Sequence, residues 1–314
     1  MKRGGLSRSA KKFLDTNLKI KKNELVSLFT DRKKCDLFDS ILNEVEHKTN
    51  RIYKVNISNK RENSQPLPDL NDIFRESNVV IGITDKSITH CPELKRAIKN
   101  GTRAITMIGV DKKLFLKSIK ADMNKIKKIN NYLIKKLKNT KKVRVTTHTG
   151  TDIVFKVIKK NISHDDGDST KKGSLNNFPY GEVFVAPIKK ANGILVIDYS
   201  KINIKPGDKA TFLIINGKIV DNSGGKAQKF VDYLENVDGD RALKVVELGF
   251  GTNPEHKKLI QNIMHDEKIY GSVHVAFGGY GEKRKSKIHE DVMLLNPTVW
   301  FDYKIIIKDG KILG

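Results

Sequence analysis

The sequence has little of several residue types, and each shortage excludes a class of protein. Only two cysteines occur in 314 residues, Cys35 and Cys91, so there is neither a disulfide framework nor a Cys-x-x-Cys zinc pair. No apolar run approaches the roughly 20 residues that a membrane-spanning helix needs. The basic N-terminus lacks the apolar segment and cleavage site of a signal peptide, so we expect a cytoplasmic protein without a membrane partner.

Acidic residues are scarce relative to basic ones, and the imbalance suggests a polyanionic partner. The chain has 60 Lys and Arg residues against 36 Asp and Glu residues, a formal net charge of +24. Dense positive charge binds phosphates. However, lysine greatly outnumbers arginine, the basic residues are spread along the chain, and no aromatic–basic RNA-binding segment accompanies them. We therefore expect a solvated basic surface, and nucleic-acid binding without catalysis is the third hypothesis for function.

The first 140 residues alternate helical and strand-like patterns. The run "NVVIGITD" (78–85) is continuously apolar, as expected of a strand that is buried on both faces. Strands that alternate with helices predict βαβ units and a parallel sheet. A long polar helix is expected at about 111–139 and would close this part. We predict an N-terminal α/β domain with a parallel sheet at residues 1–140.

After residue 140 the pattern changes to short strands with close turns. Asn216-Gly217 and Asp309-Gly310 each separate two apolar stretches, which is the strongest short signal for a β-hairpin. One clear helical segment lies between these hairpins. We predict a C-terminal α+β catalytic domain at residues 141–314, with a mixed or antiparallel and partly barrel-like sheet.

Two histidines near the C-terminal end are candidate metal ligands. His274 lies in the strand-like segment "SVHVAFG", where a lone histidine is more often a core residue than a ligand. His289 and Asp291 are two positions apart, so an extended chain places both side chains on one face. Two histidines and a carboxylate make an ordinary triad of metal ligands, although a His-x-Asp pair alone is a weak signal.

Two glutamates strengthen the case for a metal site. Glu182 and Glu247 each lie beside a glycine where a strand meets a loop, which places a carboxylate well to line a cleft. Either one alone would favour a simpler interpretation, a salt bridge at the end of the strand to one of the many lysines. Together with the His274, His289 and Asp291 side chains, they would suit two divalent ions a few ångströms apart that activate a water molecule.

The other histidines are weaker candidates. His148 and His164 neighbour acidic residues in polar, glycine-containing segments, which are typical of surface loops. His256 and His265 lie on or near the helix expected for "PEHKKLIQNIMHDEK", and we expect both to be exposed.

Several motifs in a fixed order resemble the aminopeptidase T and aminopeptidase S family of metal-dependent exopeptidases. The segments are "GTD", "NFPYGEVFVAP", "ANGILVID", "ELGFGTNP", "EKIYGSVHVAFG" and "IHEDVML". The resemblance is dense from about residue 141 onward and thinner before it. It implies a dinuclear metal site in the C-terminal domain of a homodimeric metallohydrolase that removes N-terminal residues from small peptides. The ions would be zinc, cobalt or manganese.

The resemblance also implies roles for individual residues. The metal ligands of the family match Glu182, Glu247, His274, His289 and Asp291. Glu182 could in addition transfer the proton during water attack. A family tyrosine that follows the strand histidine is matched by Tyr280 only with a shift of one position. The basic run 282–287 has no counterpart in the family pattern, and it favours an anionic substrate if it borders the cleft.

The same fold also resembles non-haem Fe(II) dioxygenases that open the ring of dihydroxypyridine. That site needs two histidines and one carboxylate, which His274, His289 and Asp291 can supply. We take the aminopeptidase as the main hypothesis because Glu182 and Glu247 would serve a second metal ion, and the ring-cleaving dioxygenase is the alternative.

Overall fold

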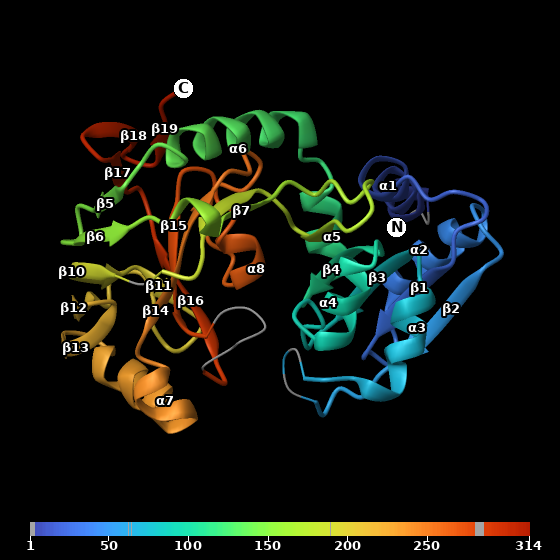
Figure 1. The fold of residues 1–314 in the computed structure, drawn as a ribbon, viewed down its shortest axis with the longest axis horizontal. Helices are drawn as coiled ribbons and strands as arrows, with labels where there is room; N and C mark the ends of the chain where they lie inside the picture. Colours follow the sequence, from blue (N-terminus) through green and yellow to red (C-terminus); the bar gives the residue numbers. More distant parts are fainter. Residues whose placement is uncertain (1–3, 62, 64, 189, 280–285) are drawn as a thin grey trace. The chain divides into compact units, whose positions relative to one another are not determined.

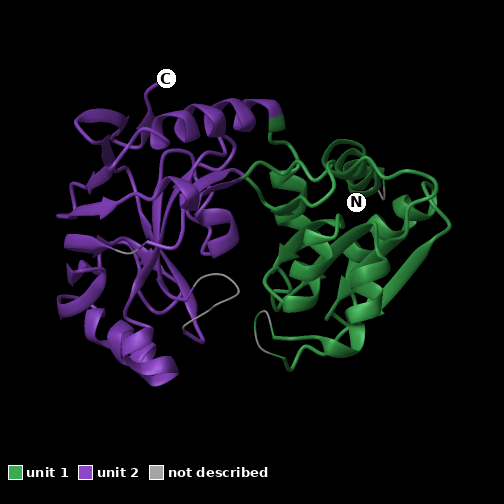
Figure 2. Ribbon diagram, in the orientation of Figure 1, with its two compact units in different colours: residues 1–123, 165–180 green, residues 124–164, 181–314 purple. Residues whose placement is uncertain are grey.

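The chain forms two compact units in the computed structural model (Figure 2). The structure describes residues 4–61, 63, 65–188, 190–279 and 286–314. Unit 1 comprises residues 1–123 and 165–180, and unit 2 comprises residues 124–164 and 181–314.

This division differs from a single boundary at residue 140. Residues 124–140, before that point, belong to unit 2, and residues 165–180, after it, belong to unit 1. Leu133 and Leu137, on the helix before residue 140, are buried in the core of unit 2. The segment 165–180 returns to unit 1, where its strand β8 (Leu175–Asn177) pairs with β4 (Arg103–Ile108).

Unit 1 contains a five-stranded sheet of order β2-β1-β3-β4-β8 in which every pair is parallel. The apolar run of the sequence forms β3 (Val79–Thr84), and all six of its residues are buried. Phe74 and Leu94, from helices α3 and α4, pack with Val80 in one apolar cluster. The predicted α/β class and its parallel sheet are confirmed.

The helices follow the sequence pattern with two differences. The long helix expected at about 111–139 is two helices, α5 (Lys112–Ser118) and α6 (Met123–Leu137), separated by a short break. The helix expected from Pro254 to Lys268 is reduced to α8 (Ile263–Asp266). The other helices are α1 (Gly4–Phe13), α2 (Asp36–Glu46), α3 (Asn71–Glu76), α4 (Pro92–Lys99) and α7 (Ala227–Asp238), and the short helical segments are η1 (Leu14–Leu18), η2 (Pro68–Leu70), η3 (Lys159–Asn161) and η4 (Gly239–Arg241).

Unit 2 contains two sheets, one of eight strands and one of six (Figure 1). The eight-stranded sheet has the order β13-β12-β10-β6-β5-β17-β18-β19, and the six-stranded sheet has the order β11-β16-β15-β14-β9-β7. Val143 and Phe155 from the larger sheet share one apolar core with Val183, Phe250 and Val275 from the smaller one. The antiparallel pairing predicted for this part is present in both sheets.

The predicted hairpins form where expected. Asn216 and Gly217 join β12 to β13, and both have positive φ, as a tight two-residue turn requires. Asp309 and Gly310 do the same between β18 and β19. The remaining strands are β1 (Val26–Thr30), β2 (Ile52–Asn56), β5 (Lys142–Thr146), β6 (Asp152–Lys156), β7 (Ile162–Asp165), β9 (Glu182–Val185), β10 (Ala191–Ile197), β11 (Tyr199–Ser200), β12 (Ala210–Ile215), β13 (Lys218–Ser223), β14 (Val245–Gly251), β15 (Val273–Gly278), β16 (His289–Leu294), β17 (Thr298–Phe301), β18 (Lys304–Lys308) and β19 (Lys311–Ile312).

Within the described part of the chain, no helix combines the length and the apolar character that crossing a membrane requires.

Candidate metal centre

Four adjacent strands of the six-stranded sheet carry the five predicted ligands. Glu182 begins β9, Glu247 lies on β14, His274 lies on β15, and His289 and Asp291 lie on β16. Residues that are more than 100 positions apart in the sequence thus meet on neighbouring strands. The structure therefore brings all five candidates to one sheet of unit 2.

The strand register places these side chains on the same face of the sheet. Ala276 of β15 pairs with Glu247 on one side and with Asp291 on the other, so the two carboxylates flank a methyl group. His274 is two positions from Ala276 and therefore points to the same face. A larger side chain at position 276 would project between the two carboxylates.

A β-bulge turns the Glu247 side chain toward this face. The register shifts between Val245 and Glu247, because Val245 pairs with Phe277 while Glu247 pairs with Ala276. In a regular strand, residues 245 and 247 would point to the same side. The bulge instead lets Val245 stay in the apolar core while Glu247 faces the candidate ligands, as bulges beside functional sites commonly do.

Gly249 makes room for the imidazole of His274. The two residues pair across β14 and β15, and a Cβ atom on Gly249 would lie 1.9 Å from Nε2 of His274. Any side chain at this position would therefore collide with the ring. The glycine that follows Glu247 and Leu248 in the sequence is needed to seat the histidine.

The buried imidazole of His274 is surrounded by carboxylates but lacks hydrogen bonds. Its Nε2 lies 3.5 Å from one oxygen of Glu182 and 3.5 Å from one oxygen of Glu247. Neither ring nitrogen has a hydrogen-bond partner among the residues that the structure describes. Buried polar atoms are nearly always satisfied, so this ring is one of the exceptions that call for a functional explanation.

His289 is held in an orientation that suits a metal ligand. Its Nδ1 donates a hydrogen bond to the backbone carbonyl of Gly279 at 2.9 Å. Its Nε2 lies 3.5 Å from Asp291 Oδ1 and 3.9 Å from Glu247 Oε2. A carbonyl that binds one ring nitrogen fixes the ring and leaves the other nitrogen to face a metal ion, which is the usual arrangement of metal-binding histidines.

The carboxylates raise the pKa of both histidines. Burial lowers the pKa of His274, but the Glu247, Glu182, Glu267 and Asp291 carboxylates outweigh it and raise that pKa to about 9. The pKa of His289 is likewise raised to about 10, because Asp291 and Glu247 outweigh the effect of burial. The carboxylates therefore favour positive charge at both rings, and a divalent cation would supply that charge in place of protons.

The carboxylates themselves fall into two groups. Burial raises the pKa of Glu247 and, against the opposing charge of Lys268, also raises the pKa of Glu182 and Glu267. The pKa of Asp291 is instead lowered, because the attraction of His289 exceeds the effect of burial. Groups of like charge that are forced together in a buried place are typical of functional sites.

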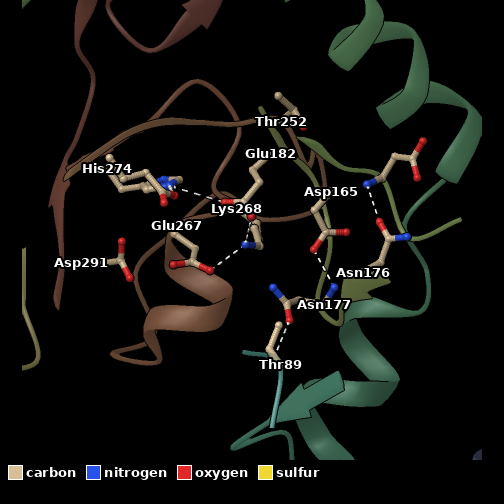
Figure 3. A network of polar contacts seen from close by, with 12 residues as sticks. Thr89, Asp165, Asn176, Asn177, Glu182, Thr252, Glu267, Lys268, His274 and Asp291 are labelled. Atoms are coloured by element: carbon tan, nitrogen blue, oxygen red, sulfur yellow. Dashed lines mark hydrogen bonds and ion pairs between the residues drawn. The ribbon is translucent and has the colours of Figure 1, made fainter. Parts of the chain in front are cut away.

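Two further charged residues belong to this cluster and were not predicted as site residues. Lys268 is fully buried, and its Nζ lies 2.7 Å from Glu182 Oε1 and 2.6 Å from Glu267 Oε1 (Figure 3). Glu267 and Lys268 are the first two residues of the motif "EKIYGSVHVAFG", and this motif was the signal in the sequence that could have identified them as site residues. The sequence from Pro254 onward predicted an exposed helix, so the burial of these two residues was not predicted.

The predicted exposure of His256 and His265 is wrong. Both side chains are fully buried, and their rings stack with centroids 3.9 Å apart. His265 Nδ1 also lies 2.8 Å from Asp266 Oδ1. Only a short helix forms here, and the end of the segment lies beside the residues that follow β14, where Asn253 N donates to Lys268 O at 3.0 Å.

The remaining candidates lie elsewhere. His148 and His164 are both exposed, and His148 contacts Asp309. His164 lies on strand β7 and not in the predicted loop. The structure does not describe Tyr280, so its predicted catalytic role stays a prediction. The same holds for most of the basic run 282–287, of which only Ser286 and Lys287 are described.

The donor set fits a bound metal ion. Oxygen or nitrogen atoms of Glu247, His274 and Asp291 all lie within 4.8 Å of one another. His289 adds a second imidazole beside Asp291, and the unsatisfied Nε2 of His274 gains a partner if a cation binds. Two imidazoles with carboxylates suit several divalent ions, and two histidines with one carboxylate are the common ligands of non-haem Fe(II) in oxygenases.

Comparisons with known proteins point to one of the two predicted activities. The family model described as "NicX: 2,5-dihydroxypyridine 5,6-dioxygenase" matches residues 19–314. A curated 2,5-dihydroxypyridine 5,6-dioxygenase of Pseudomonas putida is 23% identical over 245 residues, which cover 72% of this chain and 69% of that protein.

Solved structures share the fold. A 2,5-dihydroxypyridine dioxygenase from Pseudomonas putida KT2440 matches with a TM-score of 0.85 at 16% identity, covering 100% of this chain and 98% of the other. The structure of AmpT from Thermus thermophilus matches with a TM-score of 0.70 at 12% identity, covering 99% and 100% of the two chains. At these identities, both matches establish similarity of fold alone.

The family match corrects the main functional prediction. The predicted aminopeptidase activity, and with it the classes hydrolase and protease, is wrong, because the family model and the curated relative are both dioxygenases. The likeness to AmpT explains the error, since both activities use the same fold and the motifs around His274 and His289 were compatible with either. The chain belongs to the family of NicX, 2,5-dihydroxypyridine 5,6-dioxygenase.

Proposed function

We propose that this protein is a metal-dependent dioxygenase that opens the ring of a hydroxylated pyridine, with 2,5-dihydroxypyridine as the first substrate to test. The family match over residues 19–314 carries this proposal. The two imidazoles and the carboxylates on one face of the six-stranded sheet support it, because they are the ligands that a non-haem ferrous ion prefers.

We propose one metal ion at this site, in place of the two expected for a peptidase. His274, His289 and Asp291 would hold it, with Glu247 beside both histidines. A ferrous ion supplies the reactivity toward dioxygen that ring cleavage requires. Gly279 orients His289 through its carbonyl, and Gly249 leaves the space that His274 occupies.

We assign proton transfer to Glu182. Its carboxylate is buried, its pKa is raised by that burial, and its Oε2 lies beside Nε2 of His274. A hydroxylated ring must lose or gain protons as it opens, and a buried carboxylate with a raised pKa is a stronger base than an exposed one. Lys268 holds the other oxygen of Glu182 and so fixes the direction in which the free oxygen points.

The experiment is oxygen uptake by protein that is loaded with Fe(II) under anaerobic conditions and then supplied with 2,5-dihydroxypyridine and air. We expect uptake together with loss of the ring absorbance. Asp291→Ala should abolish both, because it removes a ligand from the site. Asp152→Ala, which breaks an exposed ion pair with Arg144 in the same unit, is the matched control and should retain activity. Iron-loaded, folded protein that consumes no oxygen with this substrate would refute the proposal.

A further inference from the structure

A lysine is buried in the candidate metal centre. Lys268 has no exposed surface, and its ammonium group contacts one oxygen of Glu182 and one oxygen of Glu267 at hydrogen-bonding distance (Figure 3). Lysine is almost never fully buried unless it is paired. A protonated lysine has no lone pair with which to bind a metal ion. Its presence among the candidate metal ligands therefore calls for another explanation.

Glu182 connects this lysine to the histidine side of the cluster. Its Oε1 lies 2.7 Å from the Lys268 ammonium, and its Oε2 lies 3.5 Å from Nε2 of His274. In a two-metal site, a bridging carboxylate likewise offers one oxygen to each of two cations, which lie about 3.5–4 Å apart. Here Oε1 of Glu182 faces the Lys268 ammonium, which is one cation, and Oε2 faces His274, where the proposed metal ion would be the other cation.

The backbone fixes the lysine in this place. Lys268 N donates to His265 O at 3.1 Å, and Asn253 N donates to Lys268 O at 3.0 Å. A Cβ atom on Gly251 would lie 2.8 Å from the carbonyl carbon of Lys268, so only glycine allows the two segments to approach this closely. Gly251 also pairs with Glu182 across β14 and β9. The strand that carries Glu182 and the segment that carries Lys268 are therefore held on either side of Gly251.

A second divalent ion beside Glu182 and Glu267 would be repelled by the positive charge of the Lys268 ammonium. Two cations on neighbouring atoms of the same buried carboxylate repel each other strongly, since the low-dielectric interior screens their charges poorly. The Glu182 and Glu267 carboxylates, which would otherwise be free to bind that ion, are already neutralised in part by Lys268.

We propose that Lys268 takes the place of a second metal ion. It is a positioning residue: it keeps Glu182 outside the metal shell as a proton acceptor, and it limits the site to one ion. This inference rests on the metal site of the proposed function but not on the identity of its ring substrate.

The experiment measures the number of metal ions per chain. Wild-type protein and variants are saturated with Mn(II), freed of excess metal and analysed by mass spectrometry of the element. We expect about one ion in the wild type and about two in Lys268→Met, because the freed Glu182 and Glu267 carboxylates then bind a second ion. Lys268→Arg keeps a cation beside both carboxylates and should stay near one. Lys48→Met removes a partly buried, ion-paired lysine in unit 1 and should also stay near one.

Spectroscopy and a second variant guard against misfolding. Removing Lys268 leaves two buried carboxylates unpaired, so Lys268→Met can be unstable. Lys268→Gln keeps a hydrogen-bond donor without the charge and should also bind about two ions. Electron paramagnetic resonance of the wild type should give the six-line signal of an isolated Mn(II) ion. A coupled Mn(II) pair in the wild type, or about one ion in folded samples of either neutral variant, would overturn the proposal.

The two proposals fail in different ways. Wild-type protein that holds one ion but does not consume oxygen would refute ring cleavage. A rise to two ions in Lys268→Met would still support the role of Lys268 in that case.

Discussion

Two buried polar clusters, one in each unit, differ in how completely their hydrogen bonds are made. In unit 1, Thr106 Oγ1 lies 2.8 Å from Thr89 Oγ1 and donates to Asn177 Oδ1 at 2.7 Å. Asn177 N donates to Asp165 at 2.8 Å (Figure 3). In unit 2, Nε2 of His274 lies 3.5 Å from an oxygen of Glu182 and from an oxygen of Glu247, and neither ring nitrogen makes a hydrogen bond to a residue that the structure describes.

The difference separates a structural cluster from a functional one. The threonines and Asn177 are neutral, and both threonine hydroxyls and the Asn177 Oδ1 atom take part in hydrogen bonds, as polar groups in protein interiors usually do. The unit 2 cluster gathers carboxylates around a ring with unmatched nitrogens, which costs stability unless a cation binds. We therefore expect changes in the unit 2 cluster to act on metal binding and changes in the unit 1 cluster to act on stability alone.

The largest effect is expected for Gly249→Ala. The added methyl group would lie 1.9 Å from Nε2 of His274, so the ring must move away from its place in the cluster. Misplacing a residue that supports metal binding weakens affinity by roughly 10–100-fold. Isothermal titration with Mn(II) measures the affinity, and circular dichroism verifies that the variant is folded.

Gly82→Ala is the matched control for this change. It adds a methyl group to another fully buried strand, 2.7 Å from the end of the Ile88 side chain in unit 1. We expect it to lower the melting temperature while the affinity for Mn(II) stays unchanged. If Gly249→Ala binds Mn(II) as tightly as Gly82→Ala does, the proposed role of His274 as a ligand is wrong.

A smaller effect is expected for pH in the metal-free protein. The pKa values of His274 and His289 are raised to about 9 and about 10, above their ordinary value of 6.5. Raised histidine pKa values stabilise the fold below about pH 6.5, and this contribution is lost as the pH rises through 9 and 10. The raised pKa values of the buried glutamates act in the same direction, because the folded state keeps their protons longer.

Melting curves test this expectation. Between pH 7 and pH 9.5, the melting temperature of metal-free protein should fall by roughly a few degrees more than that of Mn(II)-loaded protein, in which the cation replaces the histidine protons. Parallel slopes for the two samples would show that the protonated histidines of the cluster do not contribute as the structure indicates.

The sequence predicted much of this architecture because the signals were local. The apolar run at 78–85 and the Asn216-Gly217 turn each determine their own structure through periodicity or backbone conformation. The spacing of His289 and Asp291 placed both on one face for the same reason. That the five residues serve as ligands, that Tyr280 is catalytic and that the chain forms a homodimer remain predictions.

The features that were missed depend on contacts between distant segments. Nothing in "HDEK" distinguishes a buried lysine from an exposed one, because Lys268 is buried by Asn253 and Gly251 and paired by Glu182. The β-bulge before Glu247 likewise depends on how β14 pairs with β15. The ligand motifs could not decide between the aminopeptidase and the dioxygenase, because one fold can host both activities and the same ligand types suit either one.

The smallest effect is expected for Thr106→Val, which changes the satisfied cluster of unit 1. Valine has nearly the same shape, so the change removes hydrogen bonds to Thr89 and Asn177 without opening a cavity. The unfolding free energy should fall by about 1–2 kcal/mol, the usual cost of a lost buried hydrogen bond. Urea denaturation measures this loss, and Mn(II) titration should give the wild-type affinity. A change in metal affinity would mean that the unit 1 cluster also serves the metal site, and the distinction between a structural and a functional cluster would then fail.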